Sequence, residues 1–192
     1  MMMNIDIEKL SGSAILSGAI NGKILFTKLI DAAQKEPQAP IPLILDFRKI
    51  EVATASFLRE SVFAFKNHTR TVGSNYYPVV ANISDAVCDE LVLLTDARND
   101  VIIACDLDAV GRANNAVLVG SLDPKQKMTF GFVTKSNGTD ANSLMEEYGD
   151  KEKTKSTTAW NNRLAALVSR GVVREYSQGR AKFYRPLFEG VR

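Results

Sequence analysis

Four apolar residues near the end of the chain share one stripe of an amphipathic helix, at positions i, i+4, i+7 and i+8: Trp160, Leu164, Leu167 and Val168. The opposite face of this helix is polar and basic. Gly171 can adopt the left-handed backbone that ends a helix. Residues 172–176 and 182–185 have strand propensity and flank a turn over 177–180, in which Gly179 is free to take a positive φ. The pattern therefore predicts a helix followed by a two-stranded hairpin.

Two more helices are predicted upstream. Asp123-Pro124 is typical of a helix start, because proline fits the first turn, and residues 127–133 would form that helix. The same residues also suit a strand, which remains the alternative. Thr139 or Asp140 then caps a short helix over 141–148.

The last helix is capped by Thr154 or Ser156. The order of helix, short helix, longer helix and hairpin over residues 123–187 resembles that of winged helix-turn-helix proteins. This resemblance implies an α+β domain over 123–192 that binds duplex DNA, with the last helix reading base edges and the hairpin acting as a wing. The candidate DNA-binding residues are donors on that helix and hairpin: Lys155, Ser156, Thr158, Asn162, Arg163, Arg170, Arg174, Arg180 and Lys182.

Basic charge is concentrated in the same region. Residues 151–192 contain ten Lys or Arg and three Asp or Glu, a net charge of +7. Residues 1–122 contain eleven Lys or Arg and fourteen Asp or Glu, a net charge of −3. This distribution favours a nucleic-acid partner for the C-terminal part, although a solvated surface or a winged helix that docks a protein would carry it as well.

Composition narrows the class of protein. With 45% hydrophobic and 24% charged residues, the 192-residue chain is typical of a globular protein of one large or two small domains. Its apolar runs are far shorter than the roughly 20 residues needed to cross a membrane, and residues 1–6 lack the basic and apolar regions of a signal peptide. We therefore expect a cytoplasmic protein with no membrane partner. Cys88 and Cys105 are too few for a disulfide framework or a tetrahedral zinc set, and we expect them to be small buried side chains.

Predicted strands and helices alternate over residues 1–120, as in an α/β domain. The predicted strands are 13–17, 43–47, 78–82, 100–105 and 116–119. The predicted helices are 21–33, 55–67 and 85–97, the last of them capped at Ser84-Asp85. The apolar run Leu43-Ile44-Leu45-Asp46-Phe47 is typical of a strand in the middle of a sheet.

The segment LILDFRKIEVATASFLRE, residues 43–60, places Asp46-Phe47 at a strand end, Ser56-Phe57 at the next helix start and Glu60 one turn further. In these features it resembles the STAS-like domain family of unknown function. The resemblance implies an α/β domain over residues 1–120, with a mixed sheet and helices, that docks a protein partner or senses a signal.

Related STAS domains of anti-sigma antagonists present a phosphorylatable serine or threonine at this helix start. Here Ala53-Thr54-Ala55-Ser56 replaces their Asp-Ser-Gly pattern. Thr54 and Ser56 are the candidate regulatory residues at this helix start, but the missing pattern argues against their phosphorylation. Ser56 is expected first of all to cap the helix.

Residues suited to catalysis or metal binding are few. Asp100, Asp106 and Asp108 could surround a cation, but three acids at a strand end are more often a solvated turn. A single histidine provides no convincing Ser-His-Asp set, and no glycine-rich nucleotide fingerprint follows a strand. We therefore predict that the protein is not an enzyme and needs neither metal nor cofactor.

The leading hypothesis is a DNA-binding regulator whose C-terminal winged helix binds duplex DNA and whose N-terminal domain docks a partner or signal. One alternative is a protein-interaction adaptor of a signalling or defence assembly, in which the winged helix docks a protein. A second alternative is an enzyme with a deep pocket near Asp46 and Ser56. The sequence leaves open whether the chain forms a homodimer.

Overall fold

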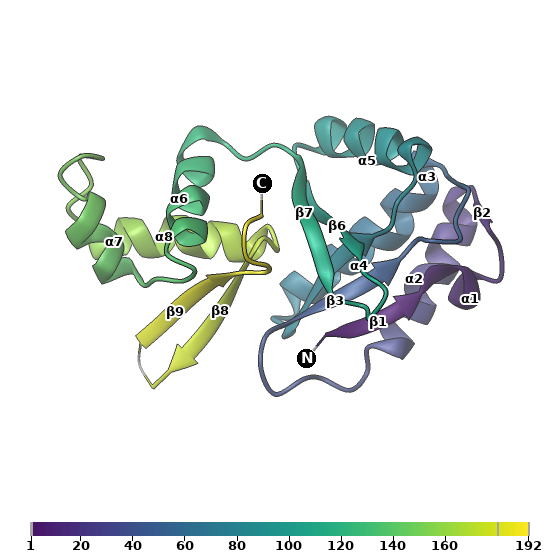
Figure 1. Ribbon diagram of the computed structural model, residues 1–192, viewed down its shortest axis with the longest axis horizontal. Coiled ribbons are helices and arrows are strands. Elements are labelled where there is room, and N and C mark those ends of the chain that lie inside the picture. The colour runs from purple at the N-terminus through teal and green to yellow at the C-terminus, as the bar shows by residue number, and fades with distance from the viewer. Residues whose placement is uncertain (1, 180, 192) are drawn as a thin grey trace.

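The computed structural model describes residues 2–179 and 181–191. Within these residues, a five-stranded sheet of order β1-β3-β5-β6-β7 lies at the centre of the molecule (Figure 1). Its strands are β1 (Met3–Asp6), β3 (Ile41–Asp46), β5 (Tyr76–Ala81), β6 (Val101–Leu107) and β7 (Ala113–Gly120). The first four run parallel, and β7 is antiparallel to β6. The protein is therefore a mixed α/β protein with a mixed sheet and helices.

Both faces of the sheet are covered, which explains why its central strands are apolar throughout. Leu43 and Leu45 of β3 join the hydrophobic cluster on one face, whereas Ile44 joins the cluster on the other. Val79 and Val80 of β5 divide between the two clusters in the same way. Successive side chains of a strand point to opposite faces of the sheet. A strand that is covered on both faces is therefore expected to be apolar at successive positions.

The first face is covered by helices from the N-terminal part of the chain. They are α1 (Ile7–Ser11), α2 (Ala19–Ala32), α3 (Ala55–Leu58), α4 (Ala64–Thr71) and α5 (Asp85–Arg98). A π-helical turn, η1 (Arg59–Phe63), joins α3 to α4, so the single helix predicted over 55–67 is confirmed with an interruption. Two short strands, β2 (Ile15–Leu16) and β4 (Val52–Ala53), pair in parallel beside α2.

Three of these elements, β1, α1 and β4, were not predicted from the pattern. They are short, and only one residue of each is buried: Ile5, Ile7 and Ala53. A single buried position provides no periodicity from which to recognise a helix or a strand.

The C-terminal elements are α6 (Pro124–Lys135), α7 (Ala141–Tyr148), α8 (Thr157–Ser169), β8 (Val173–Gln178) and β9 (Ala181–Pro186). The three predicted helices and the hairpin are confirmed, and residues 127–133 lie in a helix, not a strand. Asp123 starts α6 through a capping box with Gln126, while Asp140 caps α7 and Ser156 caps α8. Gly171 has the left-handed backbone expected at the end of α8, with φ +75°.

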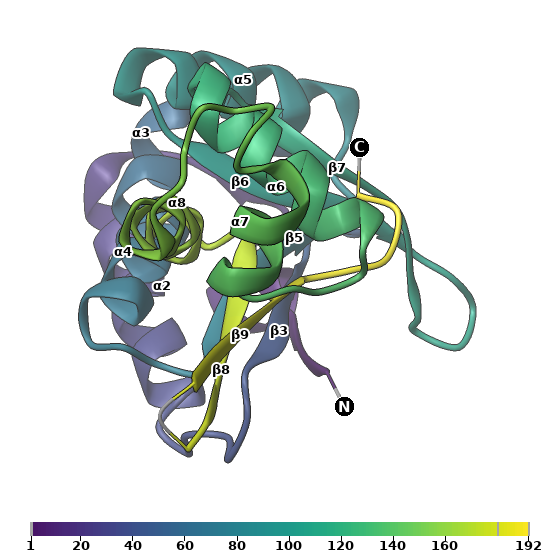
Figure 2. The same cartoon turned by 90° about the vertical axis from the view of Figure 1, so that its left-hand side faces the viewer.

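These C-terminal elements cover the second face of the sheet (Figures 1 and 2). One hydrophobic cluster contains residues of the sheet together with residues of α6, α8 and the hairpin: Ile44, Val79, Ile103, Phe130, Trp160, Leu164 and Tyr184. The two segments predicted as separate domains therefore share a hydrophobic core.

Polar contacts reinforce this junction. The buried Lys66 ammonium donates to Asp100 Oδ1 at 2.5 Å and to the Val101 carbonyl at 2.6 Å. The Arg170 guanidinium, from just beyond α8, lies 3.7 Å from the same Asp100 oxygen. Burial lowers the pKa of Lys66, and the Asp100 carboxylate opposes that shift.

Candidate nucleic-acid interface

The outward face of α8 is a stripe of short, uncharged side chains. Its exposed residues lie at positions i, i+3, i+4, i+7 and i+11: Thr158, Asn161, Asn162, Ala165 and Ser169. Trp160, Leu164 and Leu167 occupy the buried side of the same helix. Exposed helix faces commonly carry charged side chains, whereas this one carries hydroxyl, amide and methyl groups that another surface can approach closely.

Asn161 was not among the residues predicted from the sequence, although its neighbour Asn162 was. Asn161 lies three residues after Thr158 and four before Ala165, a spacing that places all three on one face of a helix. This spacing could have identified Asn161 as a candidate from the sequence. The structure brings Asn161 and Asn162 together at the edge of a hollow of about 720 Å³.

This hollow lies between α8, the start of α7 and strand β9. Asn142 and Glu146 of α7 line one wall, and Lys182 and Phe183 of β9 line another. Asp140 also borders the hollow, where its Oδ1 accepts hydrogen bonds from the backbone N–H groups of residues 142 and 143 at 2.8 and 3.0 Å. The hollow therefore has an acidic side on α7 and a basic side on the hairpin.

Three predicted DNA-binding arginines have partners inside the protein, in contrast to the free basic face expected from the sequence. The Arg163 guanidinium lies 4.6 Å from the Trp160 ring centre and donates to Thr154 Oγ1 at 3.0 Å. Arg170 donates to the Asn99 carbonyl and lies beside Asp100. Arg guanidinium groups stack on aromatic rings and pair with carboxylates, so a nearby partner in the fold can hold them.

Arg174 is held in the same way. Its guanidinium donates to the carbonyls of Pro40, at 3.4 Å, and Pro186, at 3.0 Å. Burial lowers the pKa of Arg174 from its usual value. These internal contacts stabilise the C-terminal elements α6 to β9, which we call the C-terminal module, and their contact with the sheet. The contacts are those of Arg163, Arg170 and Arg174.

The predicted lysines remain at the surface. The Lys155 side chain is 77% exposed and its ammonium lies 2.7 Å from Asp150, which raises the pKa of Lys155 through their hydrogen bond. The Lys182 side chain is 54% exposed, with its ammonium 2.9 Å from Glu175. Surface ion pairs of this kind contribute little, so a phosphate can replace the carboxylate. Arg180, also predicted to bind DNA, lies outside the described residues.

Ser156 and Thr158 differ in how their hydroxyl groups are placed to contact a ligand. The Ser156 hydroxyl accepts a hydrogen bond from the Ala159 N–H at 3.4 Å as the cap of α8. Thr158 is exposed at the start of the outward stripe. Lys155, Thr158, Asn161, Asn162 and Lys182 therefore form the accessible polar surface around α8, which we call the α8 surface.

The predicted regulatory residues lie at the other end of the molecule, where α3 begins. Thr54 caps this helix, because its Oγ1 accepts from the Phe57 N–H at 3.4 Å. The expectation that Ser56 is the cap is wrong, since the helix begins at Ala55 and Ser56 falls in its first turn. The Ala55 N–H donates to Glu90 Oε2 at 2.7 Å, so a carboxylate already occupies this helix start.

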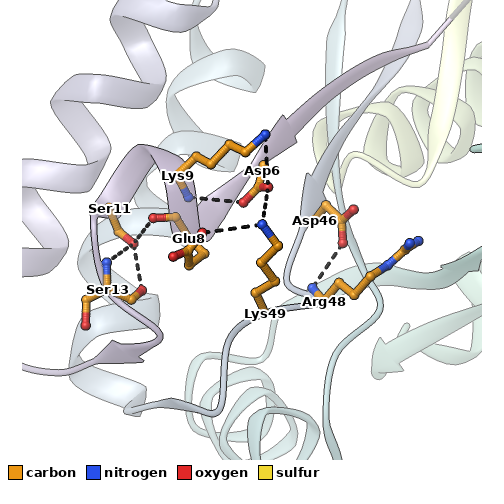
Figure 3. A network of polar contacts seen from close by, with 8 residues as sticks. All are labelled: Asp6, Glu8, Lys9, Ser11, Ser13, Asp46, Arg48 and Lys49. Carbon is orange, nitrogen blue, oxygen red and sulfur yellow. Dashed lines mark hydrogen bonds and ion pairs between the residues drawn. The ribbon is translucent and has the colours of Figure 1, made fainter.

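The carboxyl ends of β1 and β3 carry a network of charged side chains (Figure 3). Lys49 lies 3.5 Å from Asp6 and 3.6 Å from Glu8, while the Asp6 side chain caps α1. The hydrogen bond from the Lys9 backbone lowers the pKa of Asp6. These contacts fasten the loop after β3 to α1, and they account for the network as part of the fold.

Asp46, at the end of β3, also stabilises the fold through hydrogen bonds. Its Oδ1 accepts from the Arg48 N–H at 3.0 Å and from the Asn82 amide at 2.7 Å. Asn82 in turn accepts from the Leu107 N–H at 2.9 Å, which ties β3, β5 and β6 together at their carboxyl ends.

The three aspartates considered as cation ligands have other partners. Asp100 binds Lys66, Asp108 pairs with Arg112 at 3.0 Å, and Asp106 accepts from the Asn115 amide at 2.8 Å. In the part of the chain that the structure describes, no group of three or more His, Cys, Asp or Glu residues is placed to hold a metal ion. None of the helices described is long and apolar enough to cross a membrane.

Comparison with known proteins does not identify a family. No protein-family model matches the chain, and a search of curated proteins gives no significant match. The geometry of the α8 surface is therefore the strongest indication of function.

Proposed function

We propose that α6 to β9 form a winged helix that binds duplex DNA, and that the N-terminal α/β part is a STAS-like domain that docks a protein partner or senses a signal. In this proposal α8 enters the major groove, and the hairpin β8–β9 contacts the phosphate backbone. The whole chain acts as a regulator that does not catalyse a reaction.

The main support for this function is the chemistry of the outward face of α8. The major groove of B-DNA admits one α-helix, and its base edges offer donors, acceptors and the thymine methyl group. The amide, hydroxyl and methyl groups of Asn161, Asn162, Thr158 and Ala165 are complementary to these edges. Because this face carries no charged groups, its desolvation on approaching the bases costs less than that of a charged face would.

The arrangement around α8 supports the same function. The hairpin projects away from α8 in Figure 2, and Lys182 lies on its side of the hollow. Thr139, between α6 and α7, forms an antiparallel bridge with Tyr184 of β9, which ties the segment between these two helices to the hairpin. Lys155, just before α8, and Lys182, on β9, both have exposed side chains that can contact phosphates.

A partner-docking role for the N-terminal part is supported by exposed apolar side chains. Ile20 and Ile24 on α2 are 78% and 51% exposed, and Ile15 and Val52 are exposed on the paired strands β2 and β4. Apolar side chains gathered at a surface are typical of a protein-interaction site.

The salt dependence of DNA binding tests the proposal. Binding of a random duplex pool should weaken steeply as salt rises, because each phosphate contact releases counterions. Lys155→Ala and Lys182→Ala should each reduce the log–log salt slope by about 0.9. Lys9→Ala is the matched control, because Lys9 is similarly exposed but lies on α1. Absence of duplex binding at low salt would refute the proposal.

A second candidate function is a protein-interaction adaptor whose hollow beside α8 accepts a peptide. The acidic wall formed by Asp140 and Glu146 favours it, because carboxylates repel a phosphate backbone. The internal contacts of Arg163, Arg170 and Arg174 favour it as well, since they reduce the free positive charge. This candidate predicts a complex that depends weakly on salt and does not compete with duplex DNA.

A further inference from the structure

We propose that Asn161 and Asn162 are the base-reading residues of α8 and that they select adenine–thymine base pairs. The inference rests on the proposed DNA-binding function and extends it to the class of sequence recognised.

The two asparagines are placed to contact a ligand and have no task within the fold. Both are exposed at the middle of α8 and both line the hollow beside it. Within residues 2–179 and 181–191, the structure shows no hydrogen bond from either side-chain amide to another group of the chain. Arg163, the next residue, is the strongest donor nearby but is held by Trp160 and Thr154.

The chemistry of the amide group favours adenine. In the major groove adenine presents its N7 acceptor beside its N6 amino donor, and the NH₂ and C=O of one asparagine can bond to both at once. Guanine presents two acceptors, N7 and O6, which suit the paired donors of arginine or lysine better. Because contacts within the fold hold the Arg163 guanidinium, we expect α8 to prefer adenine over guanine.

The small residues on the same face fit the partner base. Thr158 and Ala165 lie one turn to either side of the asparagine pair and present methyl groups. Such methyl groups make apolar contact with the C5-methyl group of thymine. Ala165 also leaves room for the helix to approach the base edges closely.

Selection from a random duplex pool, followed by titration of single sequences, tests the inference. The parent protein should enrich adenine–thymine pairs at one or two adjacent positions, with a preference of roughly tenfold to a hundredfold for each pair. The Asn161→Ala and Asn162→Ala double variant should bind all duplexes with similar affinity and keep the salt slope of the parent. Asn67→Ala, at an exposed position of α4 away from the hollow, is the matched control and should keep the preference.

A modified base makes the test independent of how the variants fold. Replacing the selected adenines by 7-deaza-adenine removes the N7 acceptor and should weaken binding of the parent protein by about tenfold per lost bidentate contact, without affecting the double variant. Duplex binding with no preference, or with a guanine–cytosine preference, would overturn the inference and leave the proposed function standing. Failure of the parent to bind any duplex would instead refute the proposed function, and the inference with it.

Discussion

Lys66 is a cationic side chain whose environment is set entirely by its neighbours in the fold. Only 3% of the side chain is exposed, and its ammonium is satisfied by Asp100 and the Val101 carbonyl. A buried charge of this kind is tolerated because a counter-charge and hydrogen bonds replace its hydration. Arg170 adds a second cation beside Asp100, so this carboxylate joins α4, the start of β6 and the end of α8.

Replacing Asp100 by asparagine should therefore be strongly destabilising. Removing one partner of a buried ion pair leaves an uncompensated charge, which typically costs about 3–5 kcal/mol. Urea unfolding at neutral pH measures the loss. Asp96→Asn, an exposed position on α5, is the matched control and should change the free energy of unfolding only slightly.

The same variant should show a characteristic pH dependence. The pKa of Lys66 is lowered in the folded protein, and loss of Asp100 lowers it further. Between that lowered pKa and the ordinary value of 10.5, the unfolded chain binds more protons than the folded one, so stability rises with pH. The parent gains stability in the same way, but only above its own, less strongly lowered Lys66 pKa. The deficit of Asp100→Asn relative to the parent should therefore shrink as the pH is raised from the Lys66 pKa of the variant to that of the parent, both of which lie below 10.5. A deficit that stays constant with pH would contradict this account of Lys66.

Two glycines within helices show how packing overrides helix propensity. A Cβ atom on Gly22 of α2 would lie 2.6 Å from the Phe57 carbonyl oxygen, because α2 packs closely against α3. A Cβ atom on Gly131 of α6 meets no heavy atom of the described residues within 4 Å. Both glycines lower the intrinsic stability of their helix, but only Gly22 is needed for a helix contact.

Gly22→Ala and Gly131→Ala should consequently have opposite effects. Alanine is favoured over glycine in a helix by about 1 kcal/mol, so Gly131→Ala should raise the melting temperature. Gly22→Ala gains the same propensity but must push α2 away from α3, and it should lower the melting temperature. Thermal unfolding of the two variants measures the signs. A stabilised Gly22→Ala protein would show that α2 and α3 can separate at no cost.

At the scale of the whole molecule, the C-terminal module and the N-terminal sheet are joined by a common core. Ile44, Val79 and Ile103 of the sheet pack in the same cluster as Trp160 and Leu164 of α8. The Tyr77 hydroxyl accepts from the Glu175 N–H at 3.3 Å, and Arg174 donates to the Pro40 carbonyl, so polar contacts also cross this junction. Separation of the module would expose one face of the sheet to water.

The two parts should therefore unfold together. The single tryptophan, Trp160, reports on the C-terminal module by fluorescence, whereas far-ultraviolet circular dichroism reports on the whole chain. The two signals should give coincident denaturation curves, as expected of one cooperative unit. A fluorescence transition well before the dichroism transition would show that the module folds and unfolds by itself.

The sequence by itself determined most helices and strands, because their periodicity and end signals are local. The Trp160–Leu164–Leu167 stripe predicts α8, Asp123-Pro124 predicts the start of α6, and the run 43–47 predicts a buried strand. Short elements such as β1 and the π-helical turn within 55–71 lacked a comparable local signal.

Only the tertiary structure decided which polar groups remain accessible. Arg170 and Arg174 are of a residue type that commonly contacts DNA, yet the carbonyl groups of Asn99 and Pro40, from distant parts of the chain, accept hydrogen bonds from their guanidinium groups. The side chain of Asn161, on α8, is exposed and forms no hydrogen bond with another described residue. The partner of a long charged side chain depends on which elements pack nearby, and periodicity along the sequence carries no information about those non-local contacts.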